Sequence, residues 1–96
     1  MATFIVLANY TDQGIRGIKE STKRSSAFAE HAKSAGLMVR EVFWTMGHYD
    51  VVVIFDAPDE MTAARALMKL GSLGNIKTQT LRAFSRDEMD QIIGQM

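Results

Sequence analysis

The sequence predicts an α+β domain in which the elements follow the order β-α-β-β-α-β and four antiparallel strands form one sheet. Three observations support this fold class. The chain has 96 residues, which is enough for one core, 47% of them are hydrophobic, and two strand-helix-strand patterns of similar length follow each other. Residues 1–96 are therefore expected to form a single domain of ferredoxin-like type, with a short additional helix after the last strand.

The first unit is expected to begin with a strand at residues 3–10 (TFIVLANY), which is rich in β-branched and apolar residues. Residues 11–20 contain two glycines and fit either a short helical turn or an ordered loop. A helix is expected next, with its N-cap at Ser21 and a terminating glycine at Gly36. Its apolar face would consist of Phe28, Ala29, Ala32 and Ala35.

The second unit is expected to begin with a hairpin. Residues 37–46 (LMVREVFWTM) and 51–57 (VVVIFDA) resemble strands, and a Gly-His-Tyr-Asp segment of hairpin length separates them. Pro58 then suits the first position of a helix that ends at Gly71. The apolar face of this helix would consist of Met61, Ala64, Leu67 and Met68.

The last strand is expected at residues 75–84. Ser85 and Glu88 have the spacing of a capping box, which predicts a short terminal helix that carries Met89, Ile92 and Ile93. The chain therefore closes the ferredoxin-like pattern and adds one amphipathic helix to it.

The two strands expected at the centre of the sheet are apolar on both faces. Residues 4–8 and 51–55 are hydrophobic at every position, whereas a sheet with one face in water alternates apolar and polar residues. Two helices cover only one face, so a second copy of the chain is expected to cover the other. The sequence predicts a homodimer whose facing sheets form a barrel, and higher oligomers remain open.

Composition excludes several function classes. The chain has no cysteine, so disulfides, thiolate nucleophiles and Cys-based metal sites are excluded. The two histidines have no partner at metal-binding spacing, and we expect neither a metal nor a cofactor. The formal net charge is zero, which disfavours nucleic acid as a partner. Residues 1–6 lack a signal-peptide pattern and no apolar run suits a membrane span, so the expected location is the cytoplasm.

Nearly the whole chain resembles the GYD domain family of small bacterial proteins. The matching segments are 11–16 (TDQGIR), 45–55 (TMGHYDVVVIF), 57–59 (APD), 74–76 (GNI) and 78–84 (TQTLRAF). Members often carry arginine where this chain has His48. The resemblance implies a dimeric α/β-barrel fold and no settled biochemical activity.

Parts of the same pattern also look like the effector-binding half of leucine-responsive transcription regulators. The shared positions are Thr45, Gly47, Tyr49 and Asp50 before a strand, then Asn75, Ile76, Thr78 and Thr80. That similarity implies binding of a small metabolite at a subunit interface. Because no helix-turn-helix precedes the first strand, we expect ligand sensing rather than regulation of DNA.

The hairpin offers one candidate for catalysis. His48, Tyr49 and Asp50 place an imidazole, a phenol and a carboxylate within three residues, so His48 is a candidate general base that Tyr49 or Asp50 would orient. Adjacent residues point in different directions, and turn formation explains the same residues. Both interpretations stay open.

A ligand site is expected at the same end of the sheet. The crossover topology brings the end of the first strand, the hairpin and the start of the last strand together. The candidate ligand-binding residues are Asn9, Thr11, Gln13, Arg16, Trp44, Gly74 and Asn75. Amides and glycines at element ends suit a small polar or anionic ligand, and they also suit ordinary turns.

Three functions follow from these observations. The first is a small-molecule-binding dimer that acts as a stand-alone sensor or carrier, because the sequence is poor in catalytic groups. The second is a cofactor-independent isomerase or oxygenase that uses His48, Tyr49 and Asp50. The third is a structural oligomerisation module, whose interior would be closed by side chains.

Overall fold

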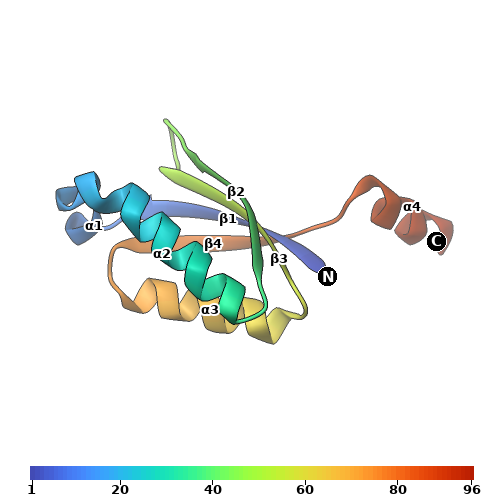
Figure 1. Cartoon of the computed structure of the whole chain (residues 1–96). Helices are drawn as coiled ribbons and strands as arrows, with labels where there is room; N and C mark the ends of the chain where they lie inside the picture. Colours follow the sequence, from blue (N-terminus) through green and yellow to red (C-terminus); the bar gives the residue numbers. More distant parts are fainter.

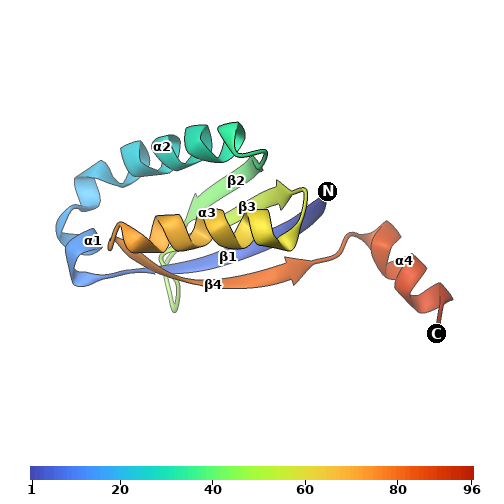
Figure 2. The same ribbon diagram turned by 90° about the horizontal axis from the view of Figure 1, so that it is seen from below.

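A computed structural model describes residues 1–96 and has the expected ferredoxin-like fold. Strands β1 (Ala2–Tyr10), β2 (Met38–Trp44), β3 (Val51–Ala57) and β4 (Ile76–Ala83) form one open sheet in the order β2-β3-β1-β4. All neighbouring strands are antiparallel. Helices α2 (Ser21–Ser34) and α3 (Glu60–Ser72) lie on the same face of the sheet (Figures 1 and 2). The predicted fold class is therefore confirmed.

The segment that the sequence left undecided, residues 11–20, is helical. It contains α1 (Asp12–Arg16) and a single 3-10 turn at Ile18–Glu20. Thr11 caps α1, because its hydroxyl accepts a hydrogen bond of 3.0 Å from the Gly14 N–H. Gly14 does not interrupt α1, because two contacts stabilise this short helix. Thr11 caps its start, and Gly14 packs against Asn75 in the turn between α3 and β4.

The hydrophobic core lies between the sheet and the two long helices. Alternate residues of β1 and β3 are buried there, namely Phe4, Val6, Ala8, Val51, Val53, Phe55 and Ala57. Phe4 and Phe55 face each other across the two strands, with ring centroids 5.4 Å apart. Ala32 and Ala63 are the buried residues of the two long helices, so small side chains let both of these helices approach the strands.

Helix α2 differs from expectation at its start. The sequence predicts Ser21 as the N-cap, but the helix begins at Ser21 and Glu20 occupies the cap position. The preceding 3-10 turn leads directly into α2, and the Ser21 hydroxyl bonds to other side chains instead of the helix end. At the other end Gly36 has the positive φ of +91° expected of a terminating glycine.

Helix α3 differs at both ends and in its buried face. Asp59 is the N-cap and accepts a hydrogen bond of 2.7 Å from the Thr62 N–H, so Pro58 precedes the helix instead of starting it. The helix continues past Gly71, and Gly74 adopts the positive φ of +83° after its end. The residues of α3 that pack on the core are Ala63, Ala66 and Leu67, and Leu70 is half-buried.

The predicted apolar face of α3 is wrong for three of its four residues. Met61 and Met68 are 75% and 76% exposed, and Ala64 is exposed as well. This helix has two overlapping apolar stripes, and periodicity alone does not choose between them. The smaller residues of the second stripe allow closer packing on the strands, which decides the orientation.

Helix α4 (Arg86–Gly94) projects away from the rest of the molecule, as Figures 1 and 2 show. The predicted capping box is confirmed, since the Ser85 and Glu88 side chains each bond to the other's backbone N–H. Arg82 holds the start of α4 through an ion pair of 3.6 Å with Glu88. The apolar residues of α4 remain exposed: Met89, Ile92 and Ile93.

The face of the sheet opposite the helices is uncovered in one chain. Cross-strand pairing places Ile5 beside Ile54 and Leu81, and Val52 beside Leu7 and Phe43, on this open face. Phe43 and Leu81 are 51% and 42% exposed. None of the helices combines the length and the apolar character that crossing a bilayer requires.

Candidate functional site

Asp50 of the hairpin is bound to the first strand. Its carboxylate accepts a hydrogen bond of 2.9 Å from the Tyr10 N–H, and its own N–H donates to the Ala8 carbonyl at 2.9 Å. The Asp50 carbonyl also accepts from the Thr45 N–H at 2.8 Å. These three bonds continue the pairing between β1 and β3 beyond the regular ladder and close the hairpin.

Tyr49 and His48 lie apart from this anchor. The Tyr49 hydroxyl donates to the Gln79 side-chain carbonyl at 3.0 Å, so it crosses the open face toward β4. His48 is exposed, next to Gly47, whose φ of +118° makes the turn. The side chains of His48, Tyr49 and Asp50 form no hydrogen bonds with one another. Asp50 contacts β1, Tyr49 contacts β4 and His48 is exposed to solvent.

Four of the expected ligand-binding residues form a joint between two turns. Thr11 donates from its hydroxyl to the Gly74 carbonyl at 2.5 Å and from its N–H to the Asn75 carbonyl at 3.1 Å. The Gln13 amide donates to the Asn75 side-chain oxygen and to the Leu73 carbonyl, both at 3.0 Å. The topology argument therefore brought Thr11, Gln13, Gly74 and Asn75 together correctly, and their polar groups satisfy one another.

The remaining expected residues are placed differently. Arg16 is exposed and bonds to the Asp12 carbonyl of its own helix at 3.2 Å. Asn9 pairs with Lys77 near the end of β1 and the start of β4. Trp44 faces the helices, where its indole N–H donates to the Ser21 hydroxyl at 3.0 Å. Trp44 and Asn75 are the two expected ligand-binding residues that line a cleft between the two long helices.

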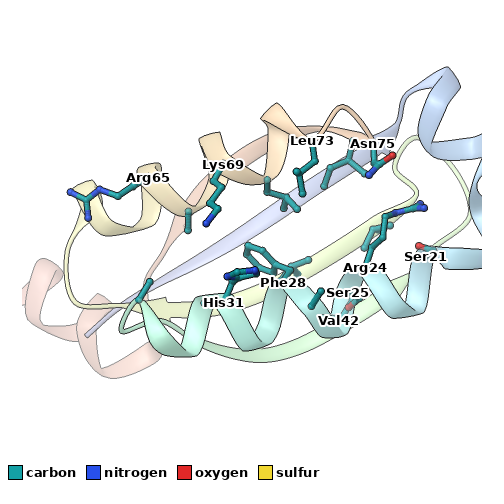
Figure 3. Close-up of a pocket in the computed structure, with 18 of the residues that line it drawn as sticks. Ser21, Arg24, Ser25, Phe28, His31, Val42, Arg65, Lys69, Leu73 and Asn75 are labelled. Atoms are coloured by element: carbon teal, nitrogen blue, oxygen red, sulfur yellow. The ribbon is translucent and has the colours of Figure 1, made fainter.

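This cleft lies between α2 and α3 and has the strands as its floor. Its volume is about 490 Å³, within the range of small-molecule sites. Figure 3 shows side chains from both helices pointing into it. The apolar part of its lining includes Phe28, Val42, Val53, Ala66, Leu70 and Ile76.

A polar cluster closes one end of the cleft. The Ser21 hydroxyl lies 2.7 Å from the Tyr10 hydroxyl and 3.0 Å from the Trp44 indole nitrogen. The Arg24 guanidinium lies at the same end and donates to the carbonyls of Gly17 and Gly14 at 2.8 and 3.3 Å. These bonds tie α2, β1 and β2 together and give the cleft a defined end.

All the charged residues that line the cleft are basic. They are Arg24, Arg65 and Lys69, and His31 joins them, while no aspartate or glutamate takes part. Arg24 is half-buried, whereas His31, Arg65 and Lys69 are exposed. Helical spacing places Arg24, Phe28 and His31 on one stripe, but only the position of α3 shows that this stripe faces a cleft.

Two carboxyl groups outside the cleft have shifted pKa values. The hydrogen bond from the Thr62 N–H lowers the pKa of Asp59, and the charge of Arg65 adds to this effect. The hydrogen bond from the Ser85 N–H lowers the pKa of Glu88, and Arg82 contributes in the same direction. Both groups cap helices, so their shifts reflect helix structure. No group of three or more acidic, histidine or cysteine residues is arranged to bind a metal.

Two similar proteins come from Thermus thermophilus. The chain is 37% identical over 84 residues to the glutamine synthetase and cystathionine beta-lyase binding protein of this organism, and the match covers 86% of this chain and 88% of that protein. The fold also resembles the crystal structure of TTHA0845 from the same organism. That comparison has a TM-score of 0.56 and 25% sequence identity, and it covers 88% of this chain and 95% of the other.

The family model of the GYD domain matches residues 4–93. This range includes β1 apart from its first two residues, the other three strands, both long helices and most of α4. The predicted resemblance to the GYD domain family is therefore confirmed, and the chain belongs to the GYD domain family.

Proposed function

We propose that this protein is a cytoplasmic, homodimeric binding module that holds a small molecule and acts as a sensor or carrier. Its family and its relative support the coarser statement that it is a small binding module. The cleft between α2 and α3 is the observation that carries the proposal. It combines a volume of about 490 Å³ with an apolar floor and a closed polar end.

The open face of the sheet supports the dimer. Ile5, Leu7, Val52, Ile54 and Leu81 form a continuous apolar surface in the middle of that face. Burying roughly 400 Å² of such a surface contributes on the order of 10 kcal/mol. A second copy provides a matching surface through a two-fold axis, which makes it the simplest cover.

The enzyme alternative has weaker support. A cofactor-independent isomerase or oxygenase needs His48, Tyr49 and Asp50 to act on one substrate, and these side chains have separate surroundings in a single chain. A purely structural oligomerisation module needs no cleft of this size.

A second function, binding of an enzyme, is favoured by one observation. The relative from Thermus thermophilus is named as a binding protein for glutamine synthetase and cystathionine beta-lyase. We propose by analogy that this chain also binds an enzyme partner. The exposed apolar residues of α4, Met89, Ile92 and Ile93, offer a surface for such a contact.

Native mass spectrometry of the purified protein tests the main proposal. We expect a dimer that carries a small-molecule adduct from the expression host or binds one from a metabolite mixture. The adduct should be lost when Phe28 is replaced by a charged residue (Phe28→Asp), while circular dichroism checks that the fold persists. A monomer that takes up no compound from such mixtures would contradict both the dimer and the sensor or carrier role.

A further inference from the structure

Lys69 is a cation without a partner at the side of an apolar cleft. Its ammonium group takes part in none of the ion pairs, which join Lys23 to Glu20, Arg40 to Asp56 and Arg82 to Glu88. The ammonium group also makes no hydrogen bond. Lys69 accepts one from the Ser72 hydroxyl, but through its backbone carbonyl. Figure 3 shows Lys69 pointing from α3 into the cleft.

The charge around Lys69 has one sign. Arg65 lies one helical turn before it and Arg24 and His31 line the opposite wall, whereas none of the 22 lining residues is acidic. The whole chain has equal numbers of acidic and basic residues, so this local excess is not a consequence of composition. A cleft lined by charges of one sign concentrates ligands of the opposite sign.

The lining of the cleft is largely apolar and favours an apolar ligand body. Thirteen of the lining residues are hydrophobic, and they include Phe28, Leu70 and Ile76. A small inorganic anion would leave the apolar lining in contact with water, and a neutral hydrocarbon would make no contact with the basic groups. A ligand with an apolar body and an anionic head group matches both parts of the lining.

We infer that the α2–α3 cleft binds an amphiphilic anion, such as a medium-chain carboxylate. Its apolar body lies on Phe28, Leu70 and Ile76, and Lys69 binds its head group. Arg24 contributes less to the head group, because its guanidinium already donates to the Gly14 and Gly17 carbonyls. This inference rests on the proposed small-molecule function and assigns a ligand class to it.

Trp44 provides a direct measurement of binding. It is the only tryptophan of the chain and it lines the cleft, so its fluorescence reports an occupant. We would titrate the protein with decanoate, with 1-decanol and with decyltrimethylammonium, all below the concentrations at which they form micelles. The three probes share the apolar chain and differ in charge.

The expected result is a saturable change of Trp44 emission with decanoate and weaker binding of the other two probes. Lys69→Gln should weaken decanoate binding about fivefold, as expected for loss of one solvent-accessible ion pair, and leave decanol binding unchanged. The control is Lys33→Gln, since Lys33 is exposed on α2 and does not line the cleft. Added salt should weaken decanoate binding in the wild type more than in Lys69→Gln.

The outcomes separate this inference from the proposed function. Equal affinity for all three probes would overturn the anionic class and leave a small-molecule module in place. A decanoate affinity that Lys69→Gln and Lys33→Gln reduce equally would overturn the assigned head-group site. If native mass spectrometry detects a different adduct while Trp44 responds to none of the probes, the inference fails and the broader proposal stands.

Discussion

Gly14 lies directly against the carbonyl of Asn75. A Cβ atom at Gly14 would be 1.9 Å from that oxygen, which is closer than any non-bonded contact allows. The close approach lets the Thr11 N–H donate to the same carbonyl at 3.1 Å. The TDQGIR segment therefore needs glycine at its fourth position because α1 packs on the backbone of the α3–β4 turn.

We expect Gly14→Ala to destabilise the protein by about 1–3 kcal/mol, because the turn must move to admit the methyl group. The control is Gly71→Ala. Gly71 lies in α3, and a Cβ atom there would have no neighbour within 4 Å, so alanine should stabilise the helix by about 0.5–1 kcal/mol. Urea unfolding measures both variants, and equal stability of the two would contradict the packing of α1.

Asp50 is expected to act through structure, as an acceptor for the Tyr10 N–H. Asp50→Ala should cost about 1–3 kcal/mol, since a half-buried backbone donor loses its partner. Asp50→Asn keeps an acceptor oxygen and should cost less. Chemical denaturation checks this order. If both variants keep wild-type stability, the carboxylate is free for another role and the enzyme alternative gains support.

The open face can be tested with one added charge. Leu81→Lys places an ammonium group among Ile5 and its neighbours and should shift the dimer toward monomer at micromolar concentration. Thr80→Lys is the matched control, because Thr80 pairs with Val6 and points to the other side of the same strand. Analytical ultracentrifugation measures the masses. Dimers of unchanged affinity in Leu81→Lys would place the interface elsewhere.

The cap of α3 is expected to depend on pH. The pKa of Asp59 is lowered in the folded chain, so its contribution to stability is present above the ordinary pKa of 3.8 and disappears as the pH falls through the lower folded value. Asp59→Asn keeps an acceptor for the Thr62 N–H but does not titrate. Its urea midpoint should therefore fall less than that of the wild type between pH 5 and about pH 2, and parallel curves would refute the assignment.

The fold class could be read from the sequence because each element carries its own local signal. The apolar runs around Val6 and Val53 predict central strands, and the spacing of Ser85 and Glu88 predicts the last helix. Crossover topology then placed Thr11, Gln13 and Asn75 at one end of the sheet, where their hydrogen bonds now join two turns. These features depend on neighbours in the chain or on general rules of connection.

The cleft could not be read in the same way. Lys69 and His31 look like ordinary surface residues of two separate helices, and the methionine stripe of α3 competes with the alanine and leucine stripe that is buried. Which stripe packs on the strands depends on how closely each allows the helix to approach. That choice, in turn, places Lys69 at the side of the cleft that faces α2, where its side chain also remains exposed.

The amino-acid sequence by itself thus determined the order of the elements, the two apolar faces of the central strands and the positions of the turns, because propensity and hydrophobic alternation act over short distances along the chain. Only the tertiary structure decided that Trp44 faces the helices, that the hairpin groups diverge and that basic side chains of α2 and α3 share one apolar cleft. These relations arise from packing between segments far apart in sequence, where side-chain size selects among arrangements that local patterns leave equivalent.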